Sequence, residues 1–175
     1  MSRSGYTDDG DEDGTFGLWR GSVTRAIQGK RGQQALKDLA AAMDAMPVKT
    51  LAAESLVTDG GEFCTLGVLG NARGLDMKPI DPEDWDAVAE AFNLAPAMVR
   101  EIVYENDEGL LTHEHSYVEI CGPVRPWYPE YGSHSVRVSV AIPPEVLGKR
   151  RWKRMRKWVA DNISAPSPKK EQTHA

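Results

Sequence analysis

The chain has 175 residues, a formal net charge of −5 and 41% hydrophobic residues. This composition is typical of one soluble globular domain and excludes a collagen-like chain or a chain that is disordered throughout. No apolar run reaches the roughly 18 residues of a membrane span, and the first ten residues lack the apolar stretch of a secretory signal. The two cysteines, Cys64 and Cys121, lack the spacing of a disulfide framework or a zinc site. We therefore expect a cytoplasmic protein with reduced thiols, no metal, no other cofactor and no membrane partner.

The two ends of the chain have little apolar content. Residues 1–14 are rich in Gly and Asp, and residues 164–175 contain prolines and lysines without periodicity. Such segments bury too little apolar surface to offset the entropy of ordering. We expect a disordered acidic arm over 1–14, a flexible tail over 164–175 and one globular domain over 15–163.

The first third of this domain has helical periodicity. Trp19, Val23 and Ile27 share one helix face that ends near Gly29, and a second apolar stripe follows until Pro47. These patterns predict a helical hairpin. The next stretch is mixed: residues 51–57 favour a strand, and residues 63–74 fit either a strand or a short helix.

The middle of the chain predicts two short helices with many acidic residues. The sequence from Asp81 to Asp84 is typical of a helix start, and Pro96 starts a second helix through Tyr104. This outline is similar to a helix-turn-helix, but nine acids against one base over 81–108 would repel DNA. As a hypothesis, its carboxylates form an acidic surface that could enter a nucleic-acid-binding groove on another protein: Asp81, Asp84, Asp86, Glu101, Glu105, Asp107 and Glu108.

Two β-like runs follow, at residues 117–121 and 135–142, and their alternation predicts an antiparallel pair. The connection between them carries three aromatic residues that are candidates for a protein contact, although they could equally fold back on the hairpin: Trp127, Tyr128 and Tyr131.

The last predicted helix opens at Pro143–Glu145, ends near Ile163, and is strongly basic. Its segment 149–158 holds seven cationic side chains and no acid. Six of them spread around the side opposite Trp152, Met155 and Val159: Lys149, Arg150, Lys153, Arg154, Arg156 and Lys157. This side could bind phosphates or an acidic protein, or it could be a solvated face whose cations offset the acidic body.

Other motifs are weaker. Residues 9–14 match half of a calcium loop, but its closing position holds Arg20 instead of Glu. The pair His113 and His115 fits no standard zinc spacing, and we expect surface histidines. The chain contains no G-x-S-x-G, P-loop or dinucleotide fingerprint, so nothing in it indicates an enzyme.

Several stretches resemble a family of small uncharacterised proteins encoded by tailed bacteriophages and prophages of proteobacteria. They are the opening MSRSGYTDD and residues 19–33, 60–74, 80–84, 104–108 and 151–159. Family members run almost directly from the Y-E-N-D-E stretch into the basic helix, so residues 109–146 resemble an inserted β-hairpin. The family lends no activity to any residue, and the resemblance implies only a phage context, in the cytoplasm of a bacterial host cell.

Together these patterns predict an α+β fold: a mostly helical single domain with a small antiparallel β-hairpin and flexible termini. The favoured function is a non-enzymatic phage or prophage accessory protein that binds a host macromolecule, such as a host defence or regulatory protein. The alternative is a nucleic-acid-binding accessory protein that acts through the basic helix, and an enzyme comes third. The oligomeric state is left open.

Overall fold

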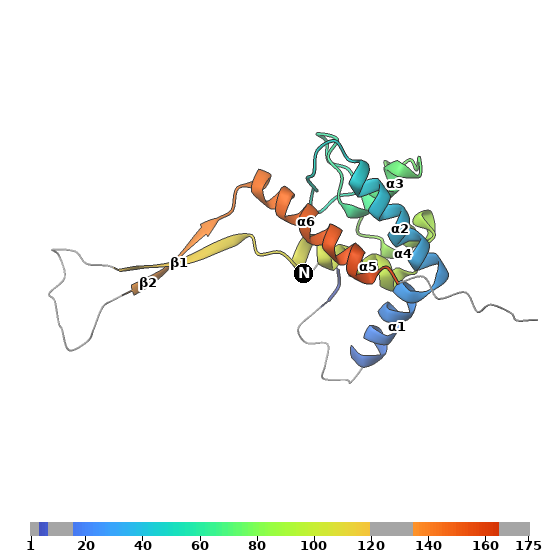
Figure 1. Ribbon diagram of the computed structural model, residues 1–175, viewed down its shortest axis with the longest axis horizontal. Coiled ribbons are helices and arrows are strands. Elements are labelled where there is room, and N and C mark those ends of the chain that lie inside the picture. The colour runs from blue at the N-terminus through green and yellow to red at the C-terminus, as the bar shows by residue number, and fades with distance from the viewer. Residues whose placement is uncertain (1–3, 7–15, 120–134, 165–175) are drawn as a thin grey trace, which may run out of the picture.

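The computed structural model describes residues 4–6, 16–119 and 135–164. Within these ranges the chain forms six α-helices, one π-helical turn and a two-stranded antiparallel sheet. The elements are α1 (Phe16–Gln28), α2 (Lys30–Ala45), α3 (Thr65–Ala72), α4 (Trp85–Phe92), α5 (Pro96–Val103), η1 (Tyr104–Glu108), β1 (His113–Glu119), β2 (Ser135–Ala141) and α6 (Pro144–Asn162). The helices gather in one body, from which β1 and β2 project (Figure 1). The predicted fold class, a mostly helical α+β domain with an antiparallel hairpin, is confirmed.

The predicted helical hairpin is formed by α1 and α2, which also supply much of the core. Leu36, Leu39 and Met43 on α2 are almost fully buried, and α2 packs against α1, α3 and α6. The two helices approach very closely at Gly32, where a Cβ atom would lie 2.0 Å from the backbone oxygen of Ala26. A side chain at this position is therefore excluded, and the glycine fixes how tightly the hairpin closes.

The mixed stretch 51–74 contains a helix rather than two strands. Residues 63–74 follow the helical alternative as α3, while the strand predicted over 51–57 is wrong: it forms only an isolated bridge, between Val57 and Phe63. The reason lies in Gly67, whose Cβ would come 1.9 Å from the backbone oxygen of Leu56. The glycines of this stretch let a helix pack directly on the preceding backbone, which a strand pattern does not reveal.

Helix α4 begins three residues later than the sequence indicates. Asp81 instead closes a separate turn, because its carboxylate accepts a hydrogen bond from the Glu83 backbone N–H at 2.9 Å. Asp84 is the true N-cap and accepts from the Ala87 N–H at 3.0 Å. The sequence offers two successive capping residues for the start of α4, and the helix begins after the second of them, Asp84.

Strand β1 begins earlier than predicted, at His113, because the polar residues before Tyr117 also pair with β2. Strand β2 agrees closely with its predicted range. Likewise α6 begins within the predicted Pro143–Glu145 start and ends one residue before Ile163.

Residues 4–6, which fall within the predicted disordered arm over 1–14, lie against the body. Ser4 is fully buried, and its backbone N–H donates to the Glu108 carboxylate at 2.7 Å. The Tyr6 ring lies 5.6 Å from Trp19 and 5.1 Å from Tyr104 between ring centroids. The low average hydropathy of the arm concealed one aromatic side chain with a specific docking site.

Candidate functional site

The basic helix α6 is tied to the body by a buried arginine on its inner side. Arg151 is 7% exposed, and it donates to the backbone oxygens of Asn106 at 2.8 Å and Leu51 at 2.9 Å. Burial lowers the pKa of this guanidinium from its ordinary value. One of the seven cations therefore belongs to the core of the protein and presents no charge to a partner.

Four of the six candidate cations on α6 pair with carboxylates. Arg156 makes a two-pronged contact with Asp44, with both nitrogen–oxygen distances at 2.8 Å, and the hydrogen bonds hold the pKa of that carboxyl below its ordinary value. The other three pairs are Arg150 with Glu114, Arg154 with Glu105, and Lys157 with Asp161. Of these six cations, Lys149 and Lys153 are exposed and have no carboxylate partner among the described residues.

The hypothetical acidic surface divides into two groups. Asp81, Asp84 and Asp86 are exposed at the start of α4. The other four act within the fold: Glu105 pairs with Arg154, Asp107 accepts from the Glu54 backbone and Asn106, Glu108 accepts from Ser4, and Glu101 is buried. The structure does not bring all seven carboxylates onto one face.

For Glu101 the surface prediction is wrong. This side chain is 4% exposed and lies on the side of α5 that packs against α1. It accepts from Arg20 at 2.8 Å and from the Tyr6 hydroxyl at 2.7 Å. Burial, aided by the bond to Glu101, raises the pKa of Tyr6 well above its ordinary value. A buried carboxylate needs such partners. Arg20 lies 81 positions and Tyr6 lies 95 positions from Glu101 in the sequence.

The β-hairpin exposes three valines on one face. In its register Val138 lies opposite Ser116, Val140 opposite Glu114, and Val118 opposite Val136, so residues of the same face alternate along each strand. Val118, Val138 and Val140 are 49%, 38% and 57% exposed. We call these three side chains the valine face.

The contacts between the hairpin and the helical body lie at its base. Among the described residues, Glu114 on β1 pairs with Arg150 on α6, and the Ile142 side chain directly after β2 is buried. The Ile142 N–H also donates to the Thr112 oxygen at 2.9 Å, which joins the two ends of the hairpin to each other. A two-stranded hairpin is at best marginally stable in water unless an apolar face is covered. The valine face is thus an exposed apolar surface whose burial would stabilise the projecting ribbon.

The remaining sequence candidates take different positions. Trp127, Tyr128 and Tyr131 fall between the two strands and lie outside the described residues, as does the half calcium loop at 9–14. His113 and His115 are exposed on β1, on the face opposite the valine face. Across the ranges that the structure describes, no group of three or more His, Cys, Asp or Glu side chains could hold a metal.

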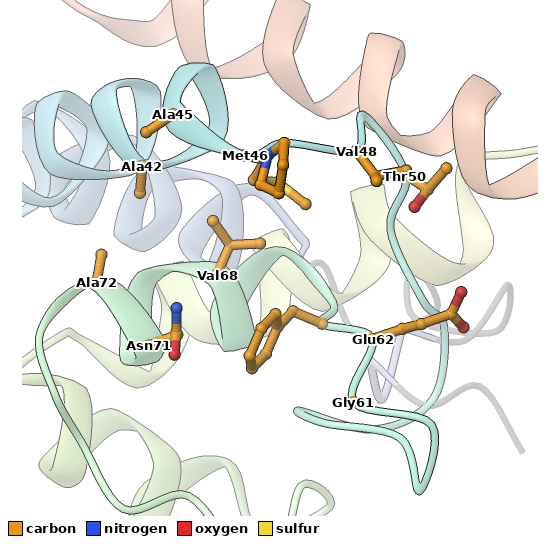
Figure 2. A pocket seen from close by; sticks show the side chains of 12 residues that line it. Ala42, Ala45, Met46, Val48, Thr50, Gly61, Glu62, Val68, Asn71 and Ala72 are labelled. Carbon is orange, nitrogen blue, oxygen red and sulfur yellow. The ribbon is translucent and has the colours of Figure 1, made fainter.

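An apolar depression next to α2 was not among the sites predicted from the sequence. A groove of about 500 Å³ lies between the last turn of α2, the turn at 60–63 and α3 (Figure 2). Ala42 and Ala45 form one wall and Val68 lies between that wall and Gly61. The signal that could have revealed it is the second set of small apolar residues on α2, away from the stripe that packs in the core.

In comparisons with known proteins, the chain matches no family model, no curated protein and no solved structure. None of the described helices is long and apolar enough to cross a membrane. The class that the geometry itself defines is a small, mostly helical α+β domain with a projecting β-hairpin.

Proposed function

We propose that this chain is a non-enzymatic accessory protein that binds a host protein through the valine face of its β-hairpin. The observation that carries this proposal is the exposure of Val118, Val138 and Val140 on one side of a ribbon that projects from the helical body (Figure 1). A contiguous exposed apolar face is typical of a protein interaction site, and it offers nothing to the phosphates of a nucleic acid.

The resemblance of other parts of the chain to phage and prophage proteins supports a bacterial host as the source of the partner. By this resemblance, residues 109–146 with the hairpin would be the part that those proteins lack. A binding element confined to this hairpin would give the chain a partner of its own while the helical body is shared. A defence or regulatory protein of the host is the kind of target that a phage-encoded accessory protein would modify.

The test is an affinity capture from nuclease-treated bacterial lysate with the full chain and two variants. The double variant V138T/V140T keeps the β-branched shape of both side chains but makes the face polar. The matched control is V57T, which makes the same change at a valine of the body that is 38% exposed and lies outside both the hairpin and the groove next to α2. We expect a host protein to be retained by the wild type and by V57T, and lost from V138T/V140T. Equal retention by all three forms would contradict the proposal.

A nucleic-acid-binding role through α6 is the second candidate. It is favoured by Lys149 and Lys153, which lie one helical turn apart and are exposed without carboxylate partners among the described residues. It is weakened by the four neighbouring cations whose charges are already paired. Duplex DNA binding at several salt concentrations, with wild type and K149E/K153E, tests it: a steep salt dependence that disappears in the variant would establish this role.

A further inference from the structure

We propose that the groove between α2 and α3 is a second protein-docking site, and that it binds a peptide segment that presents apolar side chains beside a lysine or an arginine. No residue of the hairpin lines this groove, and its lining includes one negatively charged residue. The proposal rests on the lining of the groove, on the charge at one of its ends and on the way its polar groups are distributed.

The lining of the groove is apolar and mostly short. Ala42, Ala45 and Ala72 leave room above Val68, and Val48 at the same depression is 62% exposed (Figure 2). Covering these atoms removes apolar surface from water without requiring any rearrangement of the core. A volume of about 500 Å³ accommodates several aliphatic side chains of a partner.

One end of the groove carries an uncompensated negative charge. Among the 12 residues that line the groove, only Glu62 is charged, and its exposed carboxylate has no ion pair with any described residue. Its backbone is fixed in a tight turn, because its N–H donates to the Thr58 hydroxyl at 3.1 Å and Gly61 has a φ of +79°. The turn therefore fixes the backbone from which the Glu62 side chain extends at the groove.

Lys49 lies in sequence between the lining residues Val48 and Thr50, but its charge is used elsewhere. Lys49 donates to the backbone oxygens of Met43 and Asp44 at the end of α2, and its ammonium lies 5.3 Å from the centre of the Trp152 ring. It thus compensates the negative end of the α2 dipole and contacts α6. Among the described residues no cation pairs with Glu62, so a binding partner can supply one.

The distribution of polar groups favours a peptide over a compact small molecule. Glu62 and Thr50 lie at one end, Asn71 lies toward the other, and Val68 lies between them (Figure 2). Small-ligand pockets usually converge a few polar groups on one point, whereas a peptide lays apolar side chains along a groove between helices. The occupant with matching chemistry is an amphipathic segment with its basic residue at the Glu62 end.

The test uses the full chain, labelled with ¹⁵N, and two synthetic helical peptides as probes. One peptide is built from leucine, alanine and lysine, and its twin carries glutamate in place of every lysine. We expect the lysine peptide to give saturable amide shifts at the groove, centred on Ala42, Val48, Phe63 and Val68. The glutamate twin should bind at least about tenfold more weakly, which corresponds to about 1.4 kcal/mol.

Two matched pairs of variants separate the groove from general attraction to an acidic protein. E62K should weaken the lysine peptide about fivefold or more, whereas D59K reverses a charge on the same turn outside the groove and should change affinity less than about twofold. V48S should weaken both peptides, and L18S, at a residue of α1 that is 75% exposed, should not.

Three outcomes would overturn the proposal. Equal losses of affinity for the lysine peptide in E62K and D59K would show that only long-range charge attraction acts. Shifts centred on the exposed carboxylates at the start of α4 would place the peptide elsewhere. The same groove shifts on raising the protein concentration without peptide would assign the groove to contact between copies of the chain. Because the hairpin variants leave the groove intact, its failure and that of the proposed host-binding face are distinguishable.

Discussion

The Nε atom of Arg151 on α6 donates to the backbone oxygen of Asn106 in η1 at 2.8 Å, with both residues buried. The Asn106 side chain continues the network: its oxygen accepts from the Thr65 hydroxyl at 2.7 Å, and its nitrogen donates to the Ala52 oxygen at 3.1 Å. One arginine and one asparagine thereby connect α6, η1, the start of α3 and the segment at 51–52. This network sets how α6 sits against the body and hence where the attached hairpin emerges.

We predict that R151M lowers the free energy of unfolding by about 2–4 kcal/mol, because it leaves the oxygens of Asn106 and Leu51 buried without their donors. The measurement is urea unfolding followed by circular dichroism. R150M is the control: its partner Glu114 is 63% exposed, and we expect a loss below about 1 kcal/mol. Equal effects of the two changes would show that the buried network contributes nothing special.

The docked N-terminal segment predicts a distinctive alkaline pH dependence. The pKa of Tyr6 is raised in the folded state, so the neutral phenol is favoured by folding. This contribution is fully present below the ordinary tyrosine pKa of about 10 and is lost as the pH rises from there toward the folded value. We expect the stability difference between wild type and Y6F to shrink as the pH is raised from about 9 to about 11. A difference that stays constant over that range would contradict the contact with Glu101.

The pair formed by Asp44 and Arg156 predicts the opposite dependence. The pKa of Asp44 is lowered in the folded state, so its contribution is present above the ordinary value of about 4 and is lost as the pH falls. R156M should lower the free energy of unfolding by less than about 1 kcal/mol near neutral pH, because both side chains of the pair are partly exposed to solvent, and by almost nothing at about pH 2. R25M serves as the comparison, since Arg25 has no carboxylate partner among the described residues, and it should show no such acid-dependent loss.

Local patterns predicted most of the helices well, because α1, α2, α5 and α6 each carry an apolar stripe with a proline or glycine at an end. They could not predict what the charged residues do. Arg156 meets Asp44 across 112 positions, and Glu101 meets Arg20 across 81. The number of cations along α6 does not reveal whether they face water or carboxylates of the body. The sequence therefore predicts more unpaired positive charge on this helix than the structure leaves for a partner. The groove also depends on the approach of distant segments, and its sign in the sequence is the second set of small apolar residues on α2.

The closest backbone approach between α1 and α2 gives the sharpest packing prediction. G32A places a methyl group 2.0 Å from the backbone oxygen of Ala26, which cannot move without displacing α1. We therefore expect the free energy of unfolding to fall by about 1–3 kcal/mol. G17A is the matched control on α1, where a Cβ would meet nothing within 4 Å. There the added methyl favours the helix, and stability should stay constant or rise by up to about 1 kcal/mol. Thermal unfolding of the two variants beside the wild type is sufficient. If G32A is as stable as G17A, the two helices do not cross as closely as the structure shows.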